Sequence, residues 1–558
     1  MKKALMLAAV AALGCSPVAM AGGSVKPAKC HIDHLEDGIM AIIHYGLNTY
    51  CDKEWGYGDT PASIFNPTRL DTDQWVEAMV AAGIKRVVMV TKHHDGFNLW
   101  PSPYNSDYTV ANTPWLKGKG DLVKMIHDSC LKRGLKFGVY LSPWDRHQAI
   151  YATDAYPDYY HNQFEELFTK YGPLCEIWLD GANGGDGWYG GAKERRKLKC
   201  GPAEYYRYQE LLKKMHERFP DAIAFGGAGE YSSTWVGNED GYAPDTLWYE
   251  EWGHWQTPEC DTPLRPGWFW HPHEAPKSLA KLVDIYFCSV GRGCVLNLGI
   301  APNREGLVGD DDVKRLKEFG DYVREFNAVD LAEGAKVIRS NKCIELKLKR
   351  PAKVNCMDAM EEILDGQKIG GWKFEAKVKG KWQQLADGVT IGYRRLSRFD
   401  DVVSDGFRLT ITGEKAEGAK LKQLALRYAK KIATKEVIAM QPIPCWNKYY
   451  KFTEKSTADE LFIDFTKPDV RVKALSFDPK RNKGALVDKY ELYASEDGEK
   501  WTLLKAGEFG NVKANPVKQW IYLEKPVCPK HLKLKALHAV DEVAPSWNRD
   551  DQECVRLY

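Results

Sequence analysis

Between residues 38 and 328, short apolar runs alternate with segments of helical period, and this alternation limits the possible folds more than any other feature. Apolar residues spaced at 3.6 predict helices, and continuous short apolar runs predict buried strands. Strand–helix units repeated over this length favour a (β/α) TIM-like barrel with parallel strands. A doubly wound sheet is the alternative, but no Gly-x-Gly-x-x-Gly motif follows the first strand, which weakens a dinucleotide-binding fold.

Apolar runs and the Gly, Pro and Asp residues at their ends divide this region into elements. The pattern predicts strands at 38–45, 86–91, 136–141, 177–179, 222–226 and 294–300. It predicts helices at 72–82, 121–134, 158–171, 202–219, 275–290 and 310–326.

After about residue 335 the period of the apolar residues changes to two. Ile344, Leu346 and Leu348 alternate with charged residues, and helical stretches become rare. Such alternation is typical of antiparallel strands with one face on a core. The chain is therefore predicted to be multidomain, with a barrel over 22–334 and an antiparallel β-sandwich region divided into modules 335–430 and 431–558.

The first residues predict export. Met1-Lys2-Lys3 is basic, residues 4–13 are apolar, and Ala19-Met20-Ala21 has the small-x-small form of a cleavage site, so residues 1–21 are expected to be a signal peptide. The expected location is the periplasm or the extracellular space. Residues 12–15, Ala-Leu-Gly-Cys, loosely resemble a lipoprotein box, which makes an outer-membrane lipoprotein with a lipid anchor on Cys15 the second choice.

Composition excludes several classes of function. The formal net charge is +2, and no basic run suggests a nucleic-acid partner. No stretch is apolar and long enough to predict a transmembrane helix. The 14 cysteines include no Cys-x-x-Cys pair, so nothing favours a structural zinc or a thioredoxin-like site.

Four of the predicted strands end in polar and aromatic residues. Because the carboxyl ends of parallel barrel strands meet at one rim, and barrel enzymes place their sites there, we expect these tips to lie together. The tips are His44–Tyr50 with Glu54-Trp55-Gly56, Lys92–Phe97, Tyr140–Asp145, and Trp178-Leu179-Asp180-Gly181.

Two acidic residues stand out at such tips. Residues 176–181 end their apolar run on Asp180, and Val-Gly-Asn-Glu ends on Glu239. Two carboxyl groups on one rim suggest cleavage of a glycosidic bond, in which one group attacks or assists and the other moves a proton. Asp before Gly is also common in turns, so Asp180 taken alone fits a turn about as well.

The pair His93-His94 raises the question of a metal ion. Successive residues of a strand point to opposite faces, so one ion would not bind both unless the chain bends there. Further ligands at metal spacing are missing from the sequence. We therefore expect no metal, and we favour a structural or hydroxyl-binding role, since one imidazole nitrogen donates while the other accepts.

Taken together, these segments resemble the α-L-fucosidases of glycoside hydrolase family 29. The resemblance spans about residues 36–310 and continues into the β region. The Val-Gly-Asn-Glu block and the Gly-Ala-Asn-Gly after Asp180 look like the subgroup that cleaves α-1,3- and α-1,4-linked fucose from branched Lewis-type glycans. The segments that carry it are His44-Tyr45-Gly46-x-Asn48-Thr49, Glu54-Trp55-Gly56, His93–Phe97, Trp178–Gly184, Trp235–Glu239 and Val290-Gly291-Arg292.

This resemblance implies a retaining exo-glycosidase without a cofactor. It implies that Asp180 is the nucleophile and Glu239 the acid/base, and that the partners are fucosylated oligosaccharides or glycoprotein glycans, including mucin-like ones. The β modules resemble the galactose-binding-like (discoidin) sandwiches attached to many fucosidases, and bracing of the barrel is slightly favoured over glycan binding for them. The implied substrate-binding residues are His44, Glu54, Trp55, His93, His94, Tyr140, Trp178 and Trp235.

Alternatives remain open from the sequence. Family members often carry Arg-Trp before Val-Gly-Asn-Glu, where this chain has Thr234-Trp235, so the leaving-group side is less certain. One alternative function is a retaining glycosidase for another sugar, such as a galactoside. Another is a non-catalytic fucose lectin, against which the two intact carboxylates argue. Nearby competitors for the acid/base role are Glu230, Asp240, Glu250 and Glu251.

Overall fold

The structure is a computed structural model, and it describes most of the chain. The described residues are 25–182, 188–189, 194–227, 229–251, 253–432, 449–482, 485–509, 512, 518–540, 543–548, 551 and 554–558. The predicted signal peptide and Cys15 lie outside these ranges, so export and the lipid anchor stay predictions. Among the described residues, no helix has both the length and the apolar composition needed to cross a membrane.

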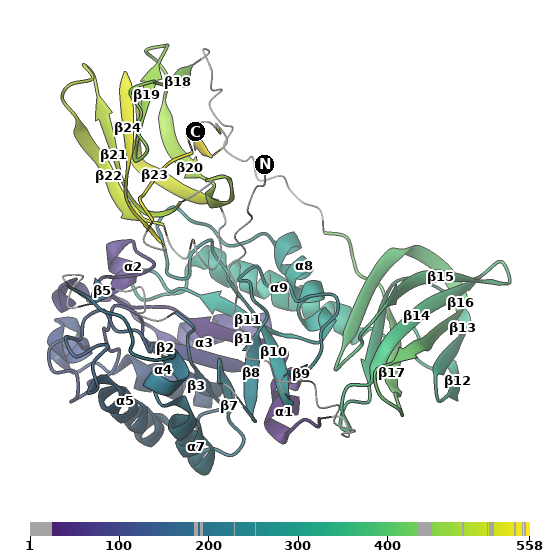
Figure 1. Ribbon diagram of the computed structural model, residues 1–558. Helices are drawn as coiled ribbons and strands as arrows, with labels where there is room; N and C mark the ends of the chain where they lie inside the picture. Colours follow the sequence, from purple (N-terminus) through teal and green to yellow (C-terminus); the bar gives the residue numbers. More distant parts are fainter. Residues whose placement is uncertain are drawn as a thin grey trace, which may run out of the picture.

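Eight parallel strands close into a barrel, which confirms the predicted fold class (Figure 1). The order is β11-β1-β2-β3-β4-β7-β8-β10, and β10 pairs with β11 to close the ring. At the seam, Ile39 of β1 lies opposite Leu296 of β11. The strands are β1 (Ile39–Ile43), β2 (Arg86–Lys92), β3 (Lys136–Leu141), β4 (Glu176–Trp178), β7 (Ile223–Phe225), β8 (Ser232–Trp235), β10 (His254–Pro263) and β11 (Val295–Ile300).

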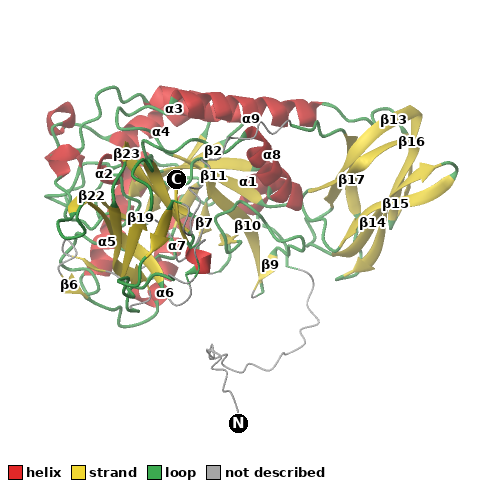
Figure 2. Cartoon of the chain, turned by 90° about the horizontal axis from the view of Figure 1, so that it is seen from above, coloured by secondary structure: helices red, strands yellow, loops and turns green. Residues whose placement is uncertain are grey.

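Helices surround the barrel, and their caps agree with the sequence. Asp71 accepts the backbone N–H of Gln74 and starts α3, which ends before Gly83 at φ 85°. α3 packs against both α4 and α9, seen along one side of the barrel in Figure 2. The helices are α1 (Lys29–Asp37), α2 (Leu47–Cys51), α3 (Thr72–Ala82), α4 (Leu122–Lys132), α5 (Tyr156–Tyr171), α6 (Pro202–Tyr205), α7 (Tyr208–Arg218), α8 (Leu279–Cys288) and α9 (Asp310–Ala328).

Two predicted helices differ from the structure. The segment 202–219 forms two helices because Arg207 adopts φ 54° between them, and the carbonyl of Tyr206 accepts a hydrogen bond from His161 Nε2 at 2.9 Å instead of continuing a helix. The helix predicted from Ala275 begins only at Leu279, where Ser278 caps it through the backbone N–H of Lys281.

A six-stranded antiparallel sheet, β12–β17, follows the barrel and lies to one side of it (Figure 1). Its apolar core includes Ile344, Leu346, Trp372 and Phe407. The apolar residues that alternate in the sequence therefore lie on the face of the sheet that packs on this core, and the charged residues between them lie on the other face. The strands are β12 (Lys336–Ser340), β13 (Cys343–Glu361), β14 (Ile369–Val378), β15 (Lys381–Gly388), β16 (Arg395–Glu414) and β17 (Leu421–Arg427).

The C-terminal strands form a sandwich of two further antiparallel sheets, in the orders β18-β19-β24-β21-β22 and β23-β20-β25. One core joins them, with Leu492 and Leu534 from the first sheet and Leu475 and Ile521 from the second. We call this unit the C-terminal sandwich. Its strands are β18 (Tyr450–Phe452), β19 (Glu460–Phe465), β20 (Val472–Phe477), β21 (Leu486–Ser495), β22 (Thr502–Glu508), β23 (Gln519–Val527), β24 (His531–Val540) and β25 (Val555–Leu557). Three two-stranded or edge pieces, β5 (Trp188–Tyr189), β6 (Glu194–Arg195) and β9 (Glu250–Glu251), complete the described strands.

Candidate active site

Asp180 lies directly after the carboxyl end of β4, as the sequence predicts. Its Oδ2 accepts the hydroxyl of Tyr140 at 2.7 Å, and its Oδ1 accepts the backbone N–H of Ala182 at 2.7 Å. The side chain keeps 23% of its surface exposed. Burial raises the pKa of Asp180, and the two hydrogen bonds oppose that rise because they favour the charged form. The result is an oriented carboxylate that a small molecule can still reach.

His94 lies next to this carboxylate, with Nε2 3.7 Å from Asp180 Oδ2. Burial holds the pKa of His94 well below its usual range, so the ring is neutral. The hydroxyl of Ser142 donates to the carbonyl of Trp144 at 2.6 Å, so its oxygen accepts from His94 Nδ1 at 2.8 Å. We therefore assign the proton to Nδ1, which leaves Nε2 as an acceptor. His94 Nε2 and Asp180 Oδ2 are thus two acceptors that face each other, an arrangement that suits a hydroxyl group donating to either. The Trp55 ring meets the His94 ring edge-on at 5.5 Å between centroids.

Aromatic rings line the other side of the space in front of Asp180 and His94. The ring of His44 lies 5.5 Å from that of His93 and 5.1 Å from that of Trp268. His93 in turn stacks on Tyr140 at 6.1 Å. Burial lowers the pKa of His44 to about 3 and that of His93 well below its usual range, so both rings are neutral at pH 7. Neutral imidazoles in an aromatic wall can both donate to and accept from hydroxyl groups.

The two adjacent histidines lie on the same side of the chain. Their ring centroids are 4.0 Å apart because β2 ends at Lys92, so the strict alternation of strand side chains no longer applies to His93 and His94. The bend that the metal interpretation required is therefore present. The rings nevertheless have other partners, since His94 bonds Ser142 and Asn48 Nδ2 lies 3.5 Å from His93 Nδ1.

Glu54 differs from the other predicted residues in what its carboxylate binds. Its Oε2 accepts the backbone N–H of Trp268 at 2.8 Å, and its Oε1 accepts that of Phe269 at 3.1 Å and lies 2.6 Å from His271 Nε2. The approach requires Gly267, since a Cβ there would lie 2.5 Å from Glu54 Oε1. In this structure Glu54 therefore fixes the loop that carries Trp268.

Glu239 reaches the same rim through that loop. β8 ends at Trp235, and the following turn places Glu239 Oε2 3.2 Å from Trp268 Nε1, which donates to it. Trp268 thus contacts His44 on the Asp180 side and Glu239 on the other. Trp235 is 38% exposed and donates its indole N–H to Asp261 Oδ1 at 2.7 Å. Burial, and then the charge of Glu239, raise the pKa of Asp261 well above its usual range.

Two of the competing acids, Glu230 and Glu250, lie elsewhere or have other partners. Glu230 precedes β8, at the end of the barrel opposite the rim, beside Tyr231, whose ring stacks on His31 of α1. Glu250 pairs with Lys415 of β16 at 3.2 Å. Glu239, by contrast, accepts the indole N–H of Trp268 at the rim.

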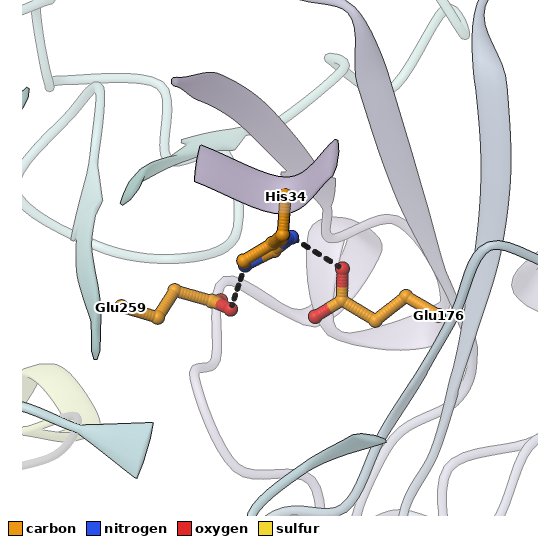
Figure 3. A group of neighbouring side chains, drawn as sticks. All are labelled: His34, Glu176 and Glu259. Carbon is orange, nitrogen blue, oxygen red and sulfur yellow. Dashed lines mark hydrogen bonds and ion pairs between the residues drawn. The ribbon is translucent and has the colours of Figure 1, made fainter. Parts of the chain in front are cut away.

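Below the rim, a fully buried network supports Trp178, which stacks on Phe225 at 3.8 Å between centroids. Glu259 Oε1 accepts Trp178 Nε1 at 3.1 Å and Asn297 Nδ2 at 2.8 Å, and Glu259 Oε2 lies 3.3 Å from His34 Nε2 (Figure 3). Burial is the largest single influence and opposes the charge of Glu259. The hydrogen bond and charge of His34, together with the hydrogen bonds from Trp178 and Asn297, outweigh burial and lower the pKa. Trp178 therefore has a fixed orientation beneath Tyr140 and Asp180.

His34, Glu176 and Glu259 lie close enough together to be tested as metal ligands. Figure 3 shows His34 between the two carboxyl groups. The oxygens of Glu259 already accept N–H donors, and Arg86 Nη1 lies 3.3 Å from Glu176 Oε2, where its charge opposes a cation. Burial, and then the charge of Glu259, raise the pKa of Glu176 well above its usual range. This donor set fits a hydrogen-bonded floor of the barrel better than a metal site.

Sequence reasoning missed Glu259, Asp261 and Trp268. The first two lie on β10, which was not predicted because its ten residues contain two prolines and several polar residues. Trp268 lies on the following loop, and no local pattern marks it. The sequence does offer one signal, because Glu259 and Asp261 are two residues apart, which is the spacing of side chains on one face of a strand. The structure shows that both are buried.

Comparisons with known proteins agree with this geometry. The sequence model of the family described as Alpha-L-fucosidase matches residues 29–328. Alpha-L-fucosidase 1 of Arabidopsis thaliana is 34% identical over 70% of this chain and 87% of its own length.

Solved structures extend the likeness beyond the barrel. A glycoside hydrolase 29 family member from an unknown rumen bacterium is 35% identical, covers 96% of this chain and 99% of its own, and has a TM-score of 0.71. A glycoside hydrolase 29 fucosidase of Ruminococcus gnavus, solved in complex with fucose, is 25% identical, with coverages of 74% and 97% and a TM-score of 0.65. Since the family model spans more than half of the chain and the rim carries two carboxyl groups among neutral imidazoles and aromatic rings, the chain belongs to the alpha-L-fucosidases of glycoside hydrolase family 29.

Proposed function

We propose that this alpha-L-fucosidase is a retaining exo-enzyme in which Asp180 is the nucleophile and Glu239 the acid/base. The observation that supports this most is the oriented, partly exposed carboxylate of Asp180 at the tip of β4, with both oxygens hydrogen-bonded. Glu239 lies across Trp268 from the aromatic wall. A retaining route needs one carboxylate to attack carbon and a second carboxyl group to move protons.

In the first step, an oxygen of Asp180 attacks the anomeric carbon of fucose, and the bond from that carbon to the glycosidic oxygen breaks. Glu239, protonated, gives its proton to the departing oxygen, which leaves as a hydroxyl. In the second step Glu239 takes a proton from water, the water oxygen attacks the same carbon, and Asp180 is released as a carboxylate. Two inversions give net retention.

The substrate pocket is proposed to lie between Asp180 and the neutral imidazoles. His44, His93 and His94 would bind hydroxyl groups of one fucose, with Trp55 on one wall. Glu54 would contribute to the pocket mainly by fixing the loop that carries Trp268. Deleting one hydrogen-bonding partner in such a site leaves polar groups unpaired, which is costly.

We further propose that the preferred substrates are α-1,3- and α-1,4-linked fucose of Lewis-type or mucin-like glycans. The support is the Gly237-Asn238-Glu239 block and the turn that it forms, in which Asn238 Nδ2 donates to the carbonyl of Tyr242 at 2.9 Å and positions Glu239 beside Trp268. Release of fucose from 1,2-, 1,3-, 1,4- and 1,6-linked oligosaccharides, compared side by side, tests this preference.

Substitution of the two carboxyl groups tests the mechanism. Asp180→Asn should lower kcat on an aryl α-L-fucoside by several orders of magnitude while the protein stays folded. Glu239→Ala should damage cleavage of oligosaccharides far more than that of aryl fucosides with good leaving groups, and azide should restore its turnover. Asp240→Asn, next to Glu239, is the matched control.

Near wild-type turnover of Asp180→Asn would refute the nucleophile assignment, and inversion at the anomeric carbon in an NMR time course would refute the retaining route. If Asp240→Asn shows the azide rescue and Glu239→Ala does not, the acid/base has been assigned to the wrong residue.

A further inference from the structure

A cavity of about 260 Å³ lies between the barrel rim and the C-terminal sandwich. Its barrel wall consists of Glu239 and residues of the segments 51–54 and 266–274, and its sandwich wall consists of Tyr490 of β21 and residues at the ends of β22 and β23. Figure 1 shows these two strands close to α2, and Lys505 of β22 pairs with Asp52 at 3.4 Å across the junction. Glu239 and Trp268 belong to the lining, and Asp180 does not.

We propose that this cavity binds the leaving group, that is, the sugars to which the fucose is attached, and that the C-terminal sandwich supplies half of the binding site. This inference rests on the proposed function. The acid/base must touch the glycosidic oxygen, and everything beyond that oxygen belongs to the leaving group. A cavity that contains Glu239 but not Asp180 therefore lies on the leaving-group side of the cleaved bond.

The sandwich wall has the chemistry that recognises sugars. Trp520 and Tyr522 are half-buried on β23, and their rings lie 5.6 Å apart with an angle of 15° between the planes. The ring of His273, from the barrel loop, lies 5.7 Å from that of Tyr522. Flat aromatic faces beside polar tips suit sugars, which have apolar C–H faces and a polar edge.

Carboxyl groups complete the lining in a form that suits hydroxyl partners. Burial raises the pKa of Glu274 to about 7 and that of Glu508 to about 7. A protonated carboxyl group can donate as well as accept, as a sugar hydroxyl does. Three lysines, Lys53, Lys505 and Lys518, line the cavity together with five acidic residues, and this mixture of charges favours a neutral oligosaccharide over a polyanion.

A cavity-filling substitution tests the proposal without removing a packed side chain. Ala506 is exposed on β22 and lines the cavity, so Ala506→Trp should fill it. We expect kcat/KM for a Lewis-type trisaccharide to fall about 10-fold or more relative to kcat/KM for an aryl fucoside, whose small leaving group reaches less of the cavity. Tyr522→Ala should change the same ratio in the same direction.

Leu503→Trp is the matched control. Leu503 lies on the same strand, is 50% exposed and does not line the cavity, so this variant should keep the wild-type ratio. Binding of the disaccharide N-acetyllactosamine, followed by saturation-transfer NMR, gives a readout independent of catalysis, and Ala506→Trp should weaken it.

An unchanged ratio in Ala506→Trp, or an equal loss on both substrates in Ala506→Trp and Tyr522→Ala, would overturn the proposal. Failure of the proposed function would look different, because wild-type enzyme would then show another stereochemical course, or activity independent of Asp180, whatever residue stands at 506.

Discussion

The sheet β12–β17 and the C-terminal sandwich both contact the barrel, but through different kinds of interface. The sheet shares the barrel core, which includes Cys356 and Leu396, and it is joined to the barrel by a buried ion network. On the sheet side, Asp358 accepts from Arg394 at 2.7 and 3.0 Å and from Arg427 at 2.6 Å. The two arginines then reach the barrel helices: Arg394 donates to Tyr286 of α8 at 3.0 Å, and Arg427 donates to the carbonyl of Asn327 of α9 at 2.9 Å.

At the sandwich, the contact is polar and encloses a cavity. Lys505 meets Asp52 there, and Lys489 lies over the ring of Tyr57 at 3.6 Å. An interface with a shared apolar core and paired charges fixes two bodies together, whereas a polar interface around a cavity leaves room for a ligand. The comparison fits the slight preference for bracing from the sequence at the sheet β12–β17, and it is consistent with the substrate binding that we propose for the sandwich.

The largest effect is expected from breaking the buried network. Asp358 is 3% exposed, so Asp358→Ala would leave the half-buried Arg394 and the buried Arg427 without their carboxylate partner. Removal of one member of a buried ion network costs about 3–5 kcal/mol in the free energy of unfolding. Urea unfolding measures it, and the oligosaccharide-to-aryl ratio of kcat/KM in the folded variant should stay at the wild-type value.

Asp405→Ala is the control for that experiment. Its partner Lys347 is 54% exposed, and such surface pairs contribute about 0–1 kcal/mol. If both variants lose equal stability, the sheet is not fixed to the barrel by Asp358.

A smaller, pH-dependent effect is expected at the sandwich side. Burial opposes the charge of His271, but hydrogen bonds with Asp52 and Glu54 outweigh it and raise the pKa to about 10. The unfolded chain has the ordinary value of about 6.5. The folded state therefore binds the proton more tightly, so this stabilisation is full below about pH 6.5 and is lost as the pH rises through about 10.

Thermal unfolding between pH 7 and pH 10 measures that loss, which amounts to at most about 4 kcal/mol. His271→Gln should show a flatter dependence of Tm on pH than the wild type over this interval. An identical slope in both proteins would mean that the charge of His271 does not stabilise the loop that carries Trp268.

The smallest effect is expected from the ion pair across the junction. Lys505 and Asp52 are 24% and 29% exposed, and Lys505→Met should change the free energy of unfolding by about 0–1 kcal/mol. Urea unfolding of this variant beside Asp358→Ala gives the contrast directly. A loss as large as that of Asp358→Ala would mean that the sandwich also braces the barrel.

The sequence was sufficient for the parts of the site that follow apolar strands. β1 to β4 consist largely of buried apolar residues, so their ends, and with them His44, His93, Tyr140 and Asp180, could be located from the pattern alone. The alternation of strands and helices over nearly 300 residues favoured a barrel, but the pattern located six of its eight strands and missed β8 and β10.

The sequence was insufficient where polar residues line the barrel interior. β10 carries Gln256, Glu259 and Asp261, and all three are buried. A buried polar residue is stabilised by partners from other strands, such as Asn297 of β11 for Glu259, and those partners are invisible in the local pattern. The contribution of Trp268 depends on a backbone contact to Glu54, more than 200 residues earlier, which no periodicity records.

The seam between β1 and β11 determines when during synthesis the site can form. Residues 39–43 pair with residues 296–300, so the ring closes only after nearly the whole barrel sequence has been made. Contacts between segments so distant along the chain form slowly, because a long loop must be ordered before they can contribute. A ribosome-bound chain that stops short of residue 300 would thus hold Asp180 and the histidines on an open sheet with an unpaired edge. Such a chain would be exposed to aggregation until the last strand arrives.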